Sequence, residues 1–219
     1  MKVVSFQLFV IFSLPAGRYS PPLGDKVRSI CFHGRRALDQ SDDFLVAAQL
    51  LGDGAGKAGL SAQVRTPMWP SPPGVADRAL VKIDATPLKD LNIPDRYDLE
   101  IVCDPTLAII PPMGGALIAG GTLFTNTPSP PETPSESLRV ISSNLEALAT
   151  IHGASLGFAL AGAAWALLGA VAKEYALAPQ DIEAASPLAL ATPPGDAEIK
   201  LLRESQKIVA ALVQGSKPD

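Results

Sequence analysis

The sequence predicts an α/β fold in which a mostly parallel sheet is covered by helices. Up to residue 141, short runs rich in β-branched and aromatic residues alternate with helical and loop segments, and beyond it the pattern is helical. Most of the 21 prolines fall between these elements. With 219 residues, 47% of them hydrophobic, the chain is long enough to bury the core of one large domain.

The first unit is a strand at residues 27–33 followed by a helix at residues 41–57. The run VRSICFH is rich in strand-forming residues and leads to Gly34. Ser41 is the expected N-cap residue of the helix, and two aspartates follow it in the first turn, where the helix dipole favours acidic side chains. Apolar side chains then recur at helical spacing from Phe44.

Four more strands are predicted at residues 60–65, 79–84, 97–104 and 138–141, and a turn-then-strand unit at residues 116–126. The strand at 97–104 has an apolar centre, which suits a sheet covered on both faces. A short helix or turn is expected around residues 87–91. The proline-rich segments 66–77 and 127–137 are loops, and a long loop inside a compact domain is often functional or part of an interface.

Helices are predicted for the rest of the chain, at residues 144–152, onward from 153 to 175, at 179–185 and at 197–214, and they are expected to cover one face of the sheet. Residues 153–172 carry no charge and include eight alanines and four glycines. Their length permits a transmembrane helix. Their weak hydrophobicity and the lack of a preceding lysine or arginine favour a buried helix wedged against a sheet or another subunit. A membrane-anchored subunit is the alternative interpretation.

The first residues of the chain are apolar and allow several interpretations. Lys2 precedes a short apolar run, as in a signal peptide. A translation start placed too far upstream and an N-terminal strand packed on the domain are the alternatives. We therefore expect three parts: an N-terminal extension at residues 1–24, the α/β domain at residues 25–190, and a C-terminal linker and helix at residues 191–219.

Composition and motifs exclude several classes of protein. The formal net charge of −4 leaves no basic stripe for nucleic acid. Two cysteines and two histidines are too few for a disulfide framework or a metal centre built by this chain. No nucleophile elbow, phosphate loop or metal-ligand pair is present in the sequence. We predict no catalytic residue and no metal ligand in this chain.

Cys31 and Cys103 each lie near the carboxyl end of a predicted strand. If these strands are neighbours in the sheet, the two thiols lie close together. Two buried, reduced thiols are the first interpretation, because free cysteine behaves as a small apolar residue. A redox pair is the alternative.

The loop after the first strand, at residues 33–40, lies where α/β sheets commonly bind ligands. A dinucleotide site would need three glycines here, and Arg36 and Ala37 stand where glycines are needed, so NAD binding is not expected. Arg35 and Arg36 are interpreted as a grip for an anion, such as a phosphate, a carboxylate or an acidic side chain of a partner. A solvated basic turn is the alternative. His33 is interpreted as a packing residue at the strand end.

The order of strand, Phe-His-Gly-Arg, glutamine and helix resembles the gamma subunit of the 2-oxoacid:ferredoxin oxidoreductases, a family whose best-known member acts on pyruvate. The family's first loop has Gly-Arg-Gly-Gly-Gln-Gly after the strand. Gly34 and Arg35 match this motif, and Gln40 matches with two residues inserted. Residues 45–51 then look like the family's first helix. Pro73 and Gly74 resemble the family's second loop, and the resemblance covers about residues 27–186.

The resemblance implies a Rossmann-like α/β domain that serves as a subunit of a complex carrying out CoA-dependent oxidative decarboxylation of a 2-oxoacid. This chain would be mainly structural and site-shaping, with no complete active site and no cofactor of its own. Partner subunits would hold thiamine diphosphate and the iron–sulfur clusters, the complex would use coenzyme A, and the location would be cytoplasmic. The residues expected to face a ligand or partner are Gly34, Arg35, Arg36, Gln40, Pro73 and Gly74. The alternative function is a stand-alone α/β protein that binds a small molecule without catalysis and is exported.

Overall fold

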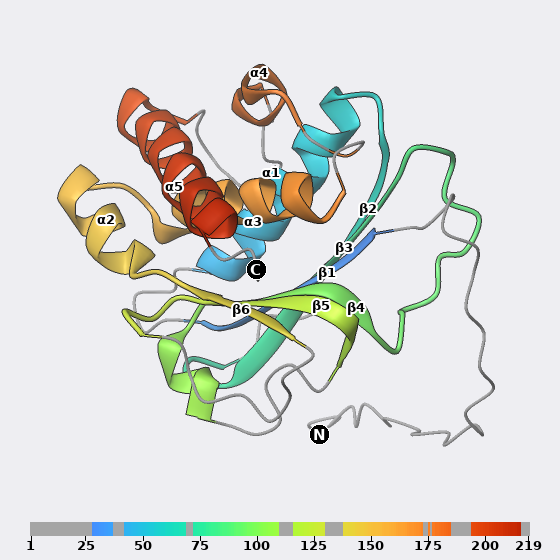
Figure 1. Ribbon diagram of the computed structural model, residues 1–219, viewed down its shortest axis with the longest axis horizontal. Helices are drawn as coiled ribbons and strands as arrows, with labels where there is room; N and C mark the ends of the chain where they lie inside the picture. Colours follow the sequence, from blue (N-terminus) through green and yellow to red (C-terminus); the bar gives the residue numbers. More distant parts are fainter. Residues whose placement is uncertain are drawn as a thin grey trace, which may run out of the picture.

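The computed structural model describes residues 28–36, 42–68, 72–109, 116–129, 138–172, 175, 177–184 and 194–215. Within these residues a six-stranded sheet forms one layer, and the α-helices form a second layer on one of its faces (Figure 1). The predicted α/β fold, with a mostly parallel sheet covered by helices, is confirmed.

The six strands are β1 (Arg28–Arg35), β2 (Ser61–Arg65), β3 (Ala76–Asp84), β4 (Tyr97–Val102), β5 (Leu117–Thr125) and β6 (Arg139–Ser142). They lie in the order β2-β3-β1-β4-β5-β6. β1, β4, β5 and β6 pair in parallel, and β3 runs antiparallel to both β1 and β2. β3 begins earlier than predicted because it pairs with β1 as far as Arg35 opposite Ala76.

The helices are α1 (Asp43–Lys57), the short 3₁₀ helix η1 (Pro105–Ile109), α2 (Leu145–His152), α3 (Leu156–Val171), α4 (Pro179–Glu183) and α5 (Asp196–Gly215). α2 and α3 are separate because Gly153 takes the left-handed conformation, with φ 62°, and closes α2. Ser155 then starts α3 by accepting a hydrogen bond from the Gly157 amide.

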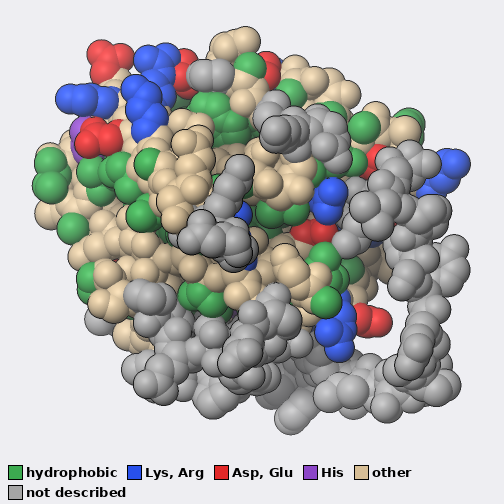
Figure 2. Space-filling view, in the orientation of Figure 1, with side chains coloured by type: hydrophobic (Ala, Val, Ile, Leu, Met, Phe, Trp, Pro, Cys, Tyr) green, Lys and Arg blue, Asp and Glu red, His purple; other side chains and the backbone are tan. Residues whose placement is uncertain are grey.

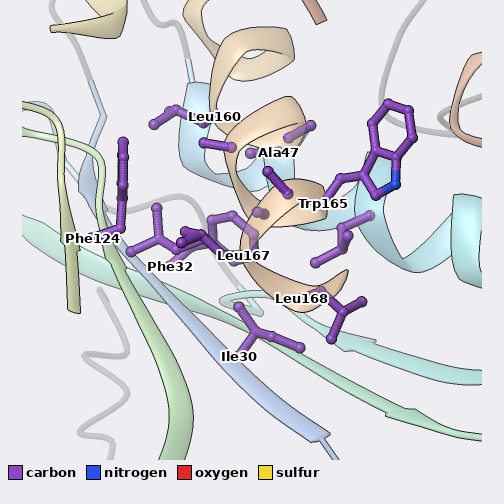
Figure 3. Close-up of a cluster of buried hydrophobic side chains, with 14 of the residues drawn as sticks. Ile30, Phe32, Ala47, Phe124, Leu160, Trp165, Leu167 and Leu168 are labelled. Atoms are coloured by element: carbon purple, nitrogen blue, oxygen red, sulfur yellow. The ribbon is translucent and has the colours of Figure 1, made fainter. Parts of the chain in front are cut away.

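α3 packs on the sheet between α1 and α5, and its residues 157–168 are all buried. Figure 3 shows Leu167 of this helix beside Phe32 of β1, and Leu168 near Ile30. The small residues of α3 allow α5 to approach closely, since a Cβ atom at Gly162 would lie 2.3 Å from the Leu202 carbonyl oxygen. α5 therefore shares the main core with α3, and the uncharged run is the buried helix that the sequence predicted.

No helix in the described part of the chain is both long enough and apolar enough to cross a membrane.

Two local predictions are wrong. Asp42, not Ser41, is the N-cap residue of α1, because its carbonyl oxygen accepts the first hydrogen bonds of the helix, from Leu45 and Val46. Residues 87–91, predicted as a short helix or turn, form an irregular segment that is neither.

Cys31 and Cys103 are buried, free thiols that lie in different apolar clusters, Cys103 under the helices and Cys31 on the opposite face of the sheet. Burial raises the pKa of both thiols. Their separation by the sheet favours two inert thiols over a redox pair.

Candidate functional site

A cleft of about 960 Å³ opens at the carboxyl ends of β1 and β4. In the described part of the chain it is bounded by the end of β1, the loop before β3, the start of η1, the first turn of α1, and α2 with the turn that leads to α3. These elements meet at one end of the sheet (Figure 1). Ligands bind at this end in most open α/β sheets, so the cleft is the candidate functional site.

Part of the cleft lining is formed where α1 packs against the end of β1. A Cβ atom at Gly34 would lie 2.5 Å from Cδ1 of Phe44, so only glycine lets this ring pack against the strand. Phe44 is buried, and both Phe44 and Cys103 belong to the cleft lining. Packing within the chain therefore explains why residue 34 is a glycine.

Arg35 joins three of the surrounding elements. Its Nε lies 3.1 Å from Oδ2 of Asp104, and its Nη1 donates a hydrogen bond of 2.9 Å to the Gly74 carbonyl oxygen. The other oxygen of Asp104 accepts hydrogen bonds from the amide and the hydroxyl of Thr106, at 2.8 Å and 2.7 Å. Arg35 thus links the ends of β1 and β4 to the loop before β3.

Arg36, the next residue, also pairs with an aspartate. Its Nε lies 3.4 Å from Oδ1 of Asp42, and its carbonyl oxygen accepts a hydrogen bond of 3.0 Å from the Gly74 amide. Gly74 has φ 82°, a conformation that glycine adopts without strain. Both arginines are therefore paired with an aspartate, and both are tied to Gly74.

The cleft brings together four of the residues that the sequence singled out, Gly34, Arg35, Arg36 and Gly74. Pro73 is exposed in the turn before Gly74 and is not part of the lining. Gln40 lies outside the described residues. That these residues face a ligand or a partner stays a prediction.

Three acidic side chains of the lining were not predicted as site residues: Asp43, Asp104 and Glu146. Asp43 Oδ1 accepts hydrogen bonds from the Ser155 hydroxyl at 2.7 Å and the Gly157 amide at 2.9 Å, which fastens the first turn of α1 to that of α3. The sequence offered only the general preference for acids in the first turn of a helix as a signal for Asp43 and Glu146.

Asn126 joins two of the elements that surround the cleft, the end of β4 and the start of α2. Its side chain donates to the Cys103 carbonyl oxygen at 3.0 Å and accepts from the Leu145 amide at 2.8 Å, at the start of α2. It is 3% exposed, and its own amide donates to the Val102 carbonyl oxygen. No sequence motif marks this residue, because its partners lie far apart along the chain.

His33 points away from the cleft. Its Nε2 lies 3.0 Å from Oε1 of Glu100, a buried carboxylate on the face of the sheet opposite the helices. This agrees with the interpretation of His33 as a packing residue at the strand end.

The chain's own residues do not fit an iron–sulfur cluster. Such clusters are usually held by four cysteine thiolates, and the two cysteines of this chain lie on opposite faces of the sheet. Among the described residues, no group of three histidine, cysteine, aspartate or glutamate side chains is placed to hold a metal ion.

No protein-family model matches the sequence, and no curated protein matches it either. Solved structures do resemble the fold. The pyruvate oxidoreductase subunit PORC of Thermotoga maritima superposes with a TM-score of 0.64 at 22% identity, covering 83% of this chain and 96% of that chain. The gamma subunit of a keto/oxoacid ferredoxin oxidoreductase from Geobacter sulfurreducens superposes with a TM-score of 0.63 at 16% identity, covering 88% and 99%.

A third similar structure is the 2-oxoglutarate:ferredoxin oxidoreductase of Magnetococcus marinus, solved with 2-oxoglutarate, coenzyme A and succinyl-CoA bound. Its TM-score is 0.59 at 10% identity, and the match covers 89% of this chain and 32% of that longer chain. At these identities the likeness establishes the fold. The chain has the Rossmann-like α/β fold seen in subunits of 2-oxoacid:ferredoxin oxidoreductases.

Proposed function

We propose that this chain is a gamma-type subunit of a 2-oxoacid:ferredoxin oxidoreductase complex that carries out CoA-dependent oxidative decarboxylation of a 2-oxoacid. The observation that carries the proposal is the extent of the match. The fold of this chain accounts for 96% and 99% of two solved subunits of such enzymes, so it corresponds to a whole subunit rather than to a shared fragment.

In this proposal the chain is mainly structural and shapes a site that other subunits complete. It supplies the cleft, and Gly34, Arg35, Arg36 and Gly74 at its edge face a ligand or a partner, together with Gln40 and Pro73 of the same loops. Partner subunits hold thiamine diphosphate and the iron–sulfur clusters, and the complex is cytoplasmic. The unsuitable placement of the two cysteines supports assigning the clusters to partners.

Co-expression tests the proposal directly. The chain, carrying an affinity tag, is produced with the thiamine-binding and iron–sulfur subunits encoded in the same genome. We expect a complex that elutes as one species in gel filtration and reduces ferredoxin when it receives pyruvate or another 2-oxoacid together with coenzyme A. Omitting this chain should abolish assembly. A chain that stays monomeric beside those subunits, with their activity unchanged by its presence, would refute the proposal.

A stand-alone protein that binds a small molecule is the second candidate, and the size of the cleft favours it. About 960 Å³ is large enough for a metabolite of drug-like size. This candidate predicts a monomer that retains a small molecule through purification, which native mass spectrometry of the chain expressed alone would detect. The gamma-subunit proposal predicts no retained molecule in that experiment.

A further inference from the structure

The helix α2, which forms one wall of the cleft, buries little of its surface. Of its eight residues only Leu145 and Ala149 are buried, whereas residues 157–168 of α3 are all buried. Figure 1 shows α2 at the left edge of the helix layer, beyond α5. An element with few buried apolar side chains opens locally at a lower free energy than the core does. We therefore expect α2 to open more readily than α3.

The chain is anchored on both sides of this wall. Leu145 is fully buried, and its amide donates to Oδ1 of Asn126 at 2.8 Å. Ten residues further on, the Ser155 hydroxyl donates to Oδ1 of Asp43 at 2.7 Å. We call residues 146–154, which lie between these two anchors, the α2 strap. Five residues of the strap line the cleft: Glu146, Ala149, Thr150, Gly153 and Ala154.

One ion pair attaches the strap to another helix. Nε2 of His152 lies 2.9 Å from Oε2 of Glu204 on α5, and the His152 side chain is 10% exposed. Among the described residues, no other side chain of the strap forms a hydrogen bond or ion pair with another helix or strand. Its apolar contacts are made by Ala149, which is buried, and by Leu148 and Ala154, which are partly buried. Figure 2 shows a histidine side chain among acidic and basic ones at the upper left, where α2 and α5 lie in Figure 1.

Gly153 provides a point about which the strap can turn. Its φ is 62°, in the left-handed region, and no atom lies within 4 Å of an added Cβ atom. Glycine enters and leaves this conformation without strain. The chain can therefore change direction at residue 153 while Ser155 stays bonded to Asp43.

Opening of the strap would uncover the inner lining of the cleft. Cys103 belongs to this lining and is 5% exposed. The Asn126 side chain donates to the Cys103 carbonyl oxygen and accepts from the Leu145 amide, so Cys103 lies close to the start of α2. Cys31 is buried on the opposite face of the sheet. The chain thus contains one thiol that reports on this wall and one that reports on the remainder of the protein.

From these observations we propose that the α2 strap is a movable wall of the cleft. The His152–Glu204 pair holds it closed, and it opens about Gly153 to give access to the cleft while Leu145 and Ser155 keep their contacts. The inference goes beyond the proposed function and does not depend on it. It concerns this chain alone, and its tests need no other subunit.

Hydrogen exchange of the full chain is the first test. In the wild type, the amides of residues 149–154 should exchange faster than those of residues 160–168 in α3. Glu204→Ala removes the partner of His152 and should speed exchange in the strap about fivefold, because a hydrogen bond between side chains is lost. Exchange in α3 should not change. Unchanged exchange in the strap, or an equal rise in α3, would overturn the inference.

Two further variants separate the ion pair from a general loss of charge on α5. Glu204→Gln keeps a hydrogen-bond acceptor for His152, so its effect on the strap should be smaller than that of Glu204→Ala. Glu183→Ala removes another ion pair of α5, the one between Arg203 and α4, and should leave the strap as in the wild type. A rise in Glu183→Ala as large as that in Glu204→Ala would contradict the role given to His152.

Gly153→Ala tests the turning point. Alanine is strained in the left-handed conformation and opening relieves the strain, so exchange in the strap should rise about fivefold or more. Gly120→Ala is the matched control, because Gly120 in β5 has φ 75° and no atom within 4 Å of an added Cβ atom. It introduces the same strain outside the strap and should leave exchange there unchanged. Equal exchange in Gly153→Ala and the wild type would rule out residue 153 as the turning point.

Alkylation by N-ethylmaleimide, followed by mass spectrometry of peptides, tests access to the cleft. Cys103 should react about fivefold faster in Glu204→Ala than in the wild type, in parallel with hydrogen exchange, while Cys31 stays protected. Equal acceleration at both thiols would indicate unfolding of the whole protein. Unchanged labelling of Cys103 would show that the strap does not control access. Either of these two results would refute the inference and leave the proposed function intact.

Discussion

Beneath the helices the sheet buries almost only apolar side chains, whereas its opposite face buries charged side chains beside a smaller apolar cluster. Ile30, Phe32 and Ile101 are fully buried under the helices, and Figure 3 shows the first two. On the other face the side chains alternate with these along β3 and β4, and four charged residues there are at most 8% exposed: Lys82, Asp84, Asp98 and Glu100. The same sheet is therefore stabilised by two kinds of contact.

The difference determines what each face can tolerate. Under the helices, small residues let α3 and α5 approach closely, so added volume is the main threat. On the opposite face each buried charge has polar partners. Lys82, for example, donates to the carbonyl oxygens of Asp90 at 2.6 Å and Asn92 at 3.1 Å. There the main threat is the loss of a partner, since a buried polar group left without one costs about 1 to 3 kcal/mol.

The largest effect is expected at Asp98, on the charged face. Its carboxylate accepts hydrogen bonds from the amide and the hydroxyl of Ser29, both at 3.0 Å, and lies 3.2 Å from Arg28 Nη1. Asp98→Ala should lower the free energy of unfolding by about 3 kcal/mol, because the buried Ser29 amide loses this acceptor. Urea denaturation measures the change. Asp98→Asn is the control that keeps an acceptor, and it should lose clearly less; equal losses would contradict this account.

The next effect concerns added volume on the helical face. A Cβ atom at Gly162 would lie 2.2 Å from the Ser205 hydroxyl and 2.3 Å from the Leu202 carbonyl oxygen. Gly162→Ala should therefore destabilise the protein by about 2 kcal/mol, as α5 is pushed away from α3.

Gly56→Ala is the matched control for that substitution. Gly56 lies in α1 with nothing within 4 Å of an added Cβ atom, so the same change should stabilise the helix by about 0.5 to 1 kcal/mol. Opposite signs in thermal and urea unfolding would support the packing argument. If both variants were more stable than the wild type, helix propensity rather than packing would govern α3.

A smaller effect is expected at the end of the sheet, where the strands and α2 are joined by Asn126. Asn126→Ala removes the acceptor of the Leu145 amide and the donor to the Cys103 carbonyl oxygen. We expect a loss of about 1 to 2 kcal/mol and faster hydrogen exchange at the start of α2, ahead of the rest of the core. Unchanged exchange in α2 would show that the helix is held by its other contacts.

The sequence predicted the strands and most helices well, because the signals for them are local. The run YDLEIVCD at residues 97–104 predicts a buried strand by itself, and β4 forms within this run. The break at Gly153 also had a local signal, a glycine that can end one helix followed by a serine that can start the next. The sequence analysis nevertheless predicted that the helix continues through residue 153.

The contacts that build the cleft had no such signal. Asp43 meets Ser155, 112 residues away in sequence, and Asn126 meets Cys103 and Leu145 across the strand ends. These pairs form only when the sheet order brings separate segments together, and periodicity carries no information about that order. Arg35 could be placed at the cleft because it lies at the carboxyl end of the first strand, but its pairing with Asp104 could not be predicted.

The smallest effect is expected at an exposed ion pair. It tests whether an exposed pair contributes as much to the stability of the protein as the buried charges of the sheet do. Arg203 on α5 donates to Glu183 on α4, with a hydrogen bond of 2.6 Å from Nη2. This contact holds the pKa of Glu183 below its usual value. A depressed carboxylate pKa stabilises the folded state at neutral pH, and the contribution is lost as the pH falls through that pKa. Glu183→Gln should therefore lower the melting temperature slightly at pH 7, and the difference from the wild type should shrink as the pH falls below the ordinary pKa range of a glutamate. Exposed ion pairs contribute little to stability on their own. A loss of stability at pH 7 as large as that of Asp98→Ala would therefore contradict the view that burial makes the Asp98 contacts the stronger ones.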